Sequence, residues 1–207
     1  MRTSEKGQSP PKTFTQRKRR DQLVDCAIDA LAELGFQGTS VAEVARRAGV
    51  SKGVVTYHFA AKDDLMFAAV AEVFDSVKEF LEDRLGGTSP ERFVADYIDA
   101  WVAYYRARTR YMLAIREIWG NFRDDSGHQH FGPEALSGEL GVVQQVLEYG
   151  QANDSLGKFD ARVVAVTMKA SLDALLNQLA TDPELDLEAY GAELVRLFER
   201  ATARLEA

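Results

Sequence analysis

Apolar residues recur along this chain at helical intervals. From Leu23 to Leu34 they are three or four positions apart, which places them on one face of an α-helix that begins near Arg17. Gly35 stands where a residue of left-handed conformation would end that helix, and Gly38 permits the following turn. No segment shows the alternation of apolar and polar residues that is typical of a β-strand.

Further helical segments follow, separated by short polar or glycine-containing breaks. Ser89 caps a helix that begins at Pro90. The other helices are expected over residues 41–48, 62–84, 109–121, 134–151, 159–180 and 185–205, with one more short helix that Ser51 caps. The pattern predicts an all-α fold of about nine helices.

Residues 38–65 carry the most specific pattern. Ser40 and Glu43 have the spacing of a capping box at the start of a short helix. Gly49 stands where a tight turn needs a positive φ, and Ser51 follows as the cap of a second short helix. Two short helices joined in this way predict a helix-turn-helix.

The outer face of the second short helix suits the major groove of DNA. Val55 and Phe59 face inward, and the outward positions are Lys52, Gly53, Val54, Thr56, Tyr57 and His58. Lysine and the helix N-terminus attract phosphate, glycine permits close approach, and the two rings can stack or hydrogen-bond. The alternative is a packing corner without a ligand, in which Tyr57 and His58 help to close the small core.

The charge distribution supports a nucleic-acid partner for one end of the chain. The net charge is −7, but residues 1–60 hold 10 basic and 6 acidic residues, a balance of +4. Residues 61–207 hold 15 and 26, a balance of −11. A basic end on an acidic body is expected where only that end meets phosphates, although a soluble basic tail would give the same balance.

Residues 38–65 resemble the DNA-binding domain of the TetR (tetracycline-repressor-like) family. The matching pieces are Leu34-Gly35-Phe36, Thr39-Ser40-Val41, Ala45-Arg46-Arg47-Ala48-Gly49-Val50-Ser51, Lys52-Gly53, Tyr57-His58-Phe59 and Lys62-Asp63-Asp64-Leu65. Two positions depart from the family pattern: Thr56 replaces a common tyrosine, and Ala60-Ala61 replaces Pro-Ser, which removes the hydroxyl cap of the next helix.

The resemblance implies an N-terminal three-helix helix-turn-helix domain and a larger C-terminal helical bundle. Residues 1–16 would be a disordered basic arm, 17–65 the DNA-binding domain and 66–207 the ligand-binding and dimerisation domain. Ser40 belongs to the DNA-binding set, and Thr39 and Lys62 would each meet a phosphate. The outward positions of the second short helix would face the groove.

The middle of the chain is rich in aromatic residues, which suits a pocket for a lipophilic compound or an ordinary core. The resemblance favours a pocket lined by Trp101, Tyr105, Met112 and Trp119, with Glu117 and Asn121 as polar anchors. The last two helices are apolar over more than one face, as in a homodimer interface or a buried monomer helix. The expected interface residues are Val166, Leu172, Leu176, Tyr190, Leu194, Leu197 and Phe198.

The sequence gives little indication of disulfides, membrane spans, catalytic sites or metal sites. The one cysteine, Cys26, excludes an internal disulfide and suits a cytoplasmic protein. No apolar run is long enough to span a membrane, and no motif indicates a cofactor or a catalytic site. His128 and His130 lie near acidic residues in a loop, but a solvated loop is favoured over a metal site there.

The leading hypothesis is therefore a cytoplasmic homodimeric repressor. It would bind a palindromic double-stranded DNA operator, and a small lipophilic or aromatic effector would release it. One alternative keeps the DNA binding but makes the body a protein-interaction or activator module without a small-molecule ligand. Another is a helical hydrolase or metalloprotein that uses His128 and His130, which no nucleophile–base pair supports.

Overall fold

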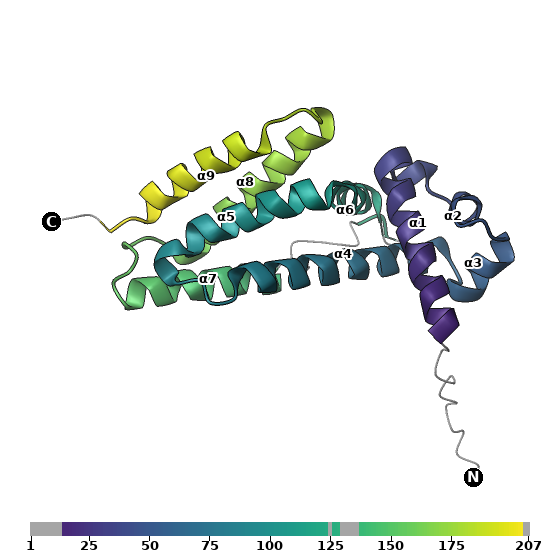
Figure 1. Cartoon of the computed structure of the whole chain (residues 1–207), viewed down its shortest axis with the longest axis horizontal. Coiled ribbons are helices and arrows are strands. Elements are labelled where there is room, and N and C mark those ends of the chain that lie inside the picture. The colour runs from purple at the N-terminus through teal and green to yellow at the C-terminus, as the bar shows by residue number, and fades with distance from the viewer. Residues whose placement is uncertain (1–13, 124–125, 129–136, 205–207) are drawn as a thin grey trace, which may run out of the picture.

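The computed structural model describes residues 14–123, 126–128 and 137–204. All regular elements in these ranges are helices, so the all-α prediction is confirmed. Three helices gather at one end of the elongated molecule, and the other helices form a body behind them (Figure 1). The bounds are α1 Phe14–Gly38, α2 Val41–Arg47, α3 Lys52–His58, α4 Lys62–Leu85, α5 Pro90–Ala107, α6 Thr109–Asn121, α7 Ser137–Ala152, α8 Ala161–Thr181 and α9 Leu187–Thr202.

The helices α1–α3, called the head below, form a small unit around the apolar face of α1. Leu23, Ile28 and Leu31 are fully buried there, together with Val44 of α2 and Val55 of α3. Gly35 has the left-handed conformation that its position in the pattern predicts, with φ 70°. It kinks α1, which continues beyond it to Gly38.

The helices α4–α9, called the body below, are connected to the head through α4 and α6. The long α4 begins at the head and runs along the body, and α6 packs against both α1 and α4 (Figure 1). Buried residues form one continuous cluster from Leu23 to Phe198. The predicted domain boundary between residues 65 and 66 lies inside α4, where Leu65 and Met66 are both buried.

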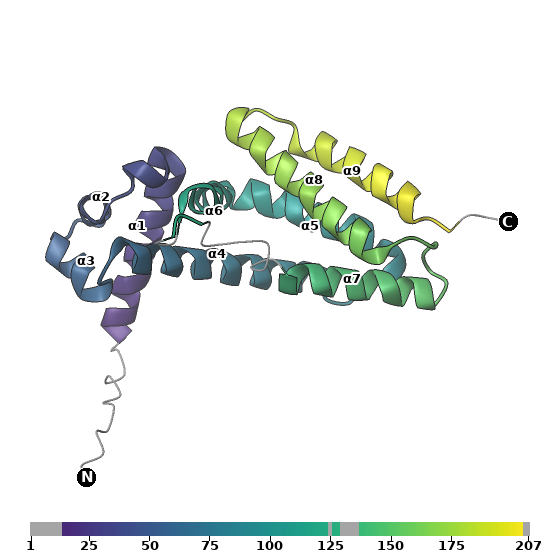
Figure 2. The same cartoon turned by 180° about the vertical axis from the view of Figure 1, so that it is seen from behind.

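The body is a bundle with α5 at its centre. That helix contacts α4, α7, α8 and α9, and its apolar face is buried from Phe93 to Tyr105. Figure 2 shows α8 lying between α7 and α9 on the far side. Within the described residues, no helix is long and apolar enough to cross a membrane.

Three local expectations need correction or lie outside the described residues. The first helix begins at Phe14, so residues 14–16 belong to it and not to an arm. Ser51 occupies the N-cap position of α3, but its side chain makes no capping hydrogen bond. The rest of the predicted arm, residues 1–13, and His130 lie outside the described residues.

Candidate nucleic-acid interface and internal cavity

The turn between α2 and α3 has the geometry of a helix-turn-helix. The hydroxyl of Ser40 accepts the backbone N–H of Glu43 at 3.1 Å, which caps α2 as predicted. Gly49 adopts φ 66°, which the tight turn requires and which side chains disfavour. Val50 N–H then donates to Ala45 O at 3.0 Å, which holds the turn closed.

The outer face of α3 is open to solvent. Lys52, Gly53, Thr56 and Tyr57 are exposed, whereas Val54 and His58 are half-buried. Tyr57 is 70% exposed, and its ring contacts His58 edge-on at 5.2 Å. Gln16 of α1 donates to the Tyr57 hydroxyl at 3.1 Å, which orients the phenol ring. The face therefore presents a cation, hydroxyl groups and an aromatic ring on a rigid support.

A network of ion pairs fixes α2 against α1. The Glu43 carboxylate accepts hydrogen bonds from Arg46 and Arg47, and Arg47 also pairs with Glu33 at 2.8 Å. Because both guanidinium groups stabilise the ionised form, the pKa of Glu43 falls to about 2. Arg47 thus joins α2 to α1, whereas Arg46 is exposed and pairs with Glu43 within α2.

Two residues that the resemblance assigns to phosphate contacts have contacts within the chain. Thr39 is 1% exposed, and its hydroxyl donates to Gly35 O at 2.9 Å. The Lys62 ammonium donates to Phe36 O at 2.7 Å and lies 4.2 Å from the centre of the Phe36 ring. Burial lowers the pKa of Lys62. Both side chains brace the end of α1, and in this conformation Thr39 is not presented to solvent.

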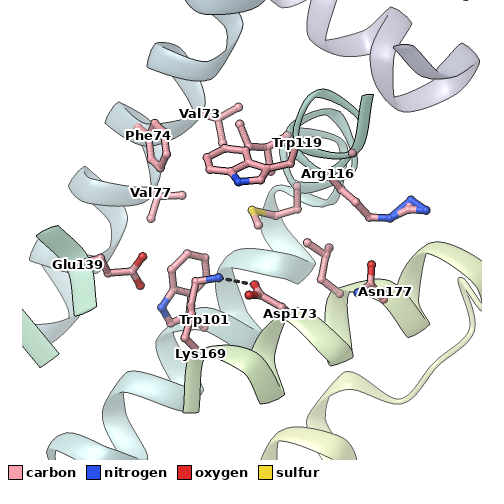
Figure 3. A pocket seen from close by; sticks show the side chains of 14 residues that line it. Val73, Phe74, Val77, Trp101, Arg116, Trp119, Glu139, Lys169, Asp173 and Asn177 are labelled. Atoms are coloured by element: carbon pink, nitrogen blue, oxygen red, sulfur yellow. Dashed lines mark hydrogen bonds and ion pairs between the residues drawn. The ribbon is translucent and has the colours of Figure 1, made fainter. Parts of the chain in front are cut away.

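The body contains a cavity of about 340 Å³ between α4, α5, α6, α7 and α8. Figure 3 shows aromatic and aliphatic side chains around it, with a polar group at one side. Its lining residues are Val73, Phe74, Val77, Trp101, Met112, Ile115, Arg116, Trp119, Gly120, Glu139, Lys169, Asp173, Leu176 and Asn177. Of the expected pocket residues, the structure brings together Trp101, Met112 and Trp119.

The polar group inside the cavity comes from α7 and α8. The Tyr97 hydroxyl donates a hydrogen bond to Glu139 Oε1 at 2.6 Å, and Lys169 pairs with Asp173 one turn away on α8. The Lys169 ammonium lies 5.6 Å from the centre of the Trp101 ring. Burial raises the pKa of Glu139, although the Tyr97 hydrogen bond and the nearby Lys169 act in the opposite direction.

The other three expected pocket residues are not among those that line the cavity. Tyr105 is fully buried in the core beside Trp101, with ring centres 5.5 Å apart. Glu117 lies at the contact between head and body, where it accepts the N–H of Phe36 at 3.2 Å. Asn121 donates to Glu117 O at 3.0 Å, within the same helix.

The residues expected at a dimer interface divide into covered and open positions. Leu172, Leu194 and Phe198 are buried by their own chain, Tyr190 is half-buried, and Leu176 lines the cavity. Val166 and Leu197 are open, at 46% and 59% exposure.

Sequence reasoning missed Glu139, Lys169 and Asp173. A signal for the last two is present, because they are oppositely charged residues four positions apart in a largely apolar helix, a spacing at which the two side chains can pair. Within the described residues, no group of three or more His, Cys, Asp or Glu side chains has an arrangement that could hold a metal ion.

These features define a helix-turn-helix protein with a cavity-containing helical body. Residues 23–69 match the family model described as bacterial regulatory proteins, TetR family. Together with the head geometry, this match shows that the head and the start of α4 are similar to the DNA-binding domain of TetR-family regulators.

A curated relative and two solved structures extend the comparison. The HTH-type transcriptional regulator BetI of Klebsiella pneumoniae (strain 342) is 31% identical over 119 residues, which are 58% of this chain and 60% of that protein. The chain therefore matches less than two thirds of that relative's length.

The solved structures share the fold. The regulator FadR from Bacillus subtilis in complex with stearoyl-CoA has a TM-score of 0.72 and 19% identity, over 86% of this chain and 96% of its own. NalD, the secondary repressor of the MexAB-OprM multidrug efflux pump in Pseudomonas aeruginosa, has a TM-score of 0.71 and 20% identity, over 93% and 100%.

Proposed function

We propose that this protein is a homodimeric transcription regulator that binds operator DNA through α3 and releases it when a small molecule occupies the body cavity. The proposal rests on the helix α6, which lines the cavity with one side and contacts the head with another. Met112, Ile115 and Trp119 of α6 line the cavity, whereas Glu117 holds the backbone of Phe36 in the head. A ligand that prefers another position of α6 would change how the head is held.

A second contact of α6 strengthens the connection to the head. Arg110 pairs with Asp25 and Asp29 of α1, and the Tyr111 hydroxyl donates to Asp25 at 3.3 Å. These groups are distributed along the side of α6 that faces α1. A shift of α6 would therefore act on the middle of α1 as well as on its end.

The proposed dimer is supported by the outer face of α8. From residue 163 to residue 181, every exposed position of this helix is uncharged. The exposed residues are Val163, Val166, Thr167, Ala170, Ala174, Asn177, Gln178 and Thr181. Leu197 adds an exposed apolar side chain on α9. Two copies joined by this face would place two heads on successive half-sites of a near-palindrome, as two-fold helix-turn-helix dimers require.

The alternative of a protein-interaction module without a small-molecule ligand predicts a closed body. A cavity of about 340 Å³ with both apolar and charged lining favours the ligand-responsive function. Members of this fold are described with stearoyl-CoA bound and as a repressor of a drug efflux pump. A cytoplasmic location, where chromosomal DNA lies, is expected from this function.

The DNA-binding half is tested by fluorescence anisotropy with the DNA upstream of the protein's own gene. Lys52→Ala removes an exposed cation from α3 and should reduce the slope of log affinity against log salt by about one. Lys158→Ala removes an exposed cation from the α7–α8 connection and should leave the slope unchanged. Equal affinity for this DNA and for a scrambled duplex would contradict the proposal.

A further inference from the structure

The charged groups of the cavity are unevenly balanced. Figure 3 shows the Glu139, Lys169 and Asp173 side chains turned toward one another beside Trp101, whereas the Arg116 guanidinium points away from them. Arg116 lies 3.4 Å from its neighbour Glu117, outside the group. The group beside Trp101 thus holds two half-buried carboxyl groups and one buried ammonium group.

The one ammonium group is already matched. Lys169 is 8% exposed and pairs directly with Asp173, which leaves Glu139 without an ion-pair partner among the described residues. The Glu139 carboxyl contacts the Tyr97 hydroxyl, a neutral donor. Glu139 is half-buried and shares the nearby Lys169 ammonium with Asp173, so its charge is only partly compensated, and a cation that enters the cavity gains an attraction that is stronger than in open water.

The walls of the cavity favour the same kind of ligand. Trp101 and Trp119 both line it, and Phe74 meets Trp119 edge-on with ring centres 5.7 Å apart. The faces of such rings attract cations, most strongly where water is excluded. Lys169 already lies over the Trp101 ring, which shows that this wall accepts an ammonium group.

We propose that the cavity binds an organic monocation, a substituted ammonium with an apolar body, with Glu139 as its counter-ion and Trp101 and Trp119 as its aromatic walls. This inference rests on the proposed function in taking the cavity as the effector site. An anionic ligand is disfavoured because Lys169 is neutralised by Asp173, and a second anion would lie near Glu139.

The test uses three probes of one shape and different charge: benzyltrimethylammonium, its carbon isostere neopentylbenzene, and phenylmethanesulfonate. The chain has two tryptophans, and both line the cavity, so intrinsic tryptophan fluorescence reports its occupancy directly. We expect the cation to bind at least about tenfold more tightly than the isostere, and the anion to bind most weakly. Equal or tighter binding of the isostere or the anion, or no binding of the cation, would overturn the inference.

Two substitutions give effects of opposite sign, which a general loss of structure cannot do. Glu139→Gln keeps the shape and the contact with Tyr97 but removes the charge, so the cation should lose about tenfold in affinity and the isostere should be unaffected. Lys169→Met removes the competing ammonium and should tighten cation binding. Glu148→Gln changes an exposed glutamate on the same helix as Glu139 and should have no effect.

The same probes separate this inference from the proposed function when operator anisotropy is measured beside fluorescence. If the isostere or the anion is preferred and lowers the affinity for DNA, the ligand-responsive regulator stands and the cation inference falls. If the cation is preferred but the DNA affinity does not change, the cavity chemistry stands and the ligand-responsive function falls.

Discussion

The head and the body use the same residue type in opposite ways. Glu43 lies on the surface of the head between two arginines, which lower its pKa to about 2. Glu139 lies inside the body, where it contacts Tyr97 and where burial raises its pKa. The first carboxylate is satisfied by its own chain and fixes geometry. The second has no direct ion pair among the described residues and is the group that we propose as a ligand's counter-ion.

A similar contrast holds for the aromatic residues. Tyr57 of the head is 70% exposed, on a helix whose inner residue Val55 is fully buried. Trp101 and Tyr105 of the body are 3% and 0% exposed. The head therefore presents an aromatic ring outside a small core, whereas the body buries its aromatic rings. Substitutions in the two regions should affect DNA binding and ligand binding separately.

The largest difference between effects on DNA binding and effects on ligand binding is expected when one buried phenylalanine is removed from each region. Phe59 is 2% exposed at the end of α3, under the Arg20 guanidinium, which lies 5.1 Å from the ring centre. Phe93 is 6% exposed on α5 and stacks on Tyr97. Each Phe→Ala substitution should lower the free energy of unfolding by about 3 kcal/mol.

The two variants should differ in what they bind. Phe59→Ala removes the support of α3 and should weaken DNA binding more than ligand binding, and Phe93→Ala should do the reverse because Tyr97 contacts Glu139. Urea unfolding followed by circular dichroism gives the stability, and anisotropy and tryptophan fluorescence give the two affinities. Equal losses of both affinities in both variants would show that head and body respond as one unit.

A smaller difference, in the stability lost on substitution by alanine, is expected between two glycines. An added Cβ at Gly157 of the body would lie 2.3 Å from Ala203 O, so Gly157→Ala forces the backbone apart and should cost about 2–3 kcal/mol. Gly49 of the head has φ 66° and nothing within 4 Å of an added Cβ. Gly49→Ala should therefore cost only the backbone strain, about 1 kcal/mol.

The control for this pair is a glycine inside a helix. Gly141 lies in α7 with open space around an added Cβ, so Gly141→Ala should raise stability by about 1 kcal/mol through helix propensity. The three changes in urea midpoint should follow that order. A cost at Gly49 equal to that at Gly157 would contradict the assignment of pure backbone strain to the turn.

Much of the fold could be predicted from local signals. The helical spacing of α1, the positive φ of Gly49 and the Ser40 cap each depend on a few neighbouring residues and have the predicted form, whereas Gly35 has the predicted positive φ but kinks α1 and does not end it. The predicted capping hydrogen bond of Ser51 is absent although serine favours this position. An N-cap preference is weak enough for the local backbone to override it.

The cavity was less accessible to sequence reasoning. Trp101 and Tyr105 lie four residues apart on one apolar face, but only Trp101 lines the cavity. Which of two such rings is covered depends on the helices that pack beside each. Glu117 contacts a residue 81 positions away in the sequence, a partner that no local pattern can indicate.

That contact leads to a prediction about the coupling of the two regions. Glu117→Ala removes the acceptor of the Phe36 N–H, which α6 provides to the head. DNA binding and ligand binding should both remain, but the change in DNA affinity on saturation with ligand should shrink by about 1 kcal/mol, roughly fivefold. Operator anisotropy with and without a saturating cavity ligand measures this change.

The matched control is Glu82→Ala on α4, where the exposed glutamate pairs with Lys78 at 3.9 Å. It removes the same charge and should leave the coupling unchanged. An unaltered coupling in Glu117→Ala would mean that α6 transmits its position through Arg110 and Tyr111 instead.

The smallest expected effects are two opposite dependences of stability on pH. The pKa of Glu43 is lowered from 4.5 to about 2, so its contribution is present above pH 4.5 and is lost as the pH falls toward 2. The pKa of Glu139 is raised from 4.5, so its contribution is present below pH 4.5 and is lost as the pH rises through the raised pKa. The groups that face Glu139 are Tyr97, Trp101, Lys169 and Asp173.

Glutamine variants separate the two effects. Glu43→Gln should lose less stability than the wild type when the pH falls from 5 toward 3, because the wild type alone must protonate a carboxylate that two arginines stabilise. When the pH rises from 4.5 toward 7, the stability of Glu139→Gln should increase relative to that of the wild type, because the glutamine never ionises. Thermal midpoints in a pH series measure both slopes, and slopes of the same sign would break the contrast between a paired surface carboxylate and an unpaired internal one.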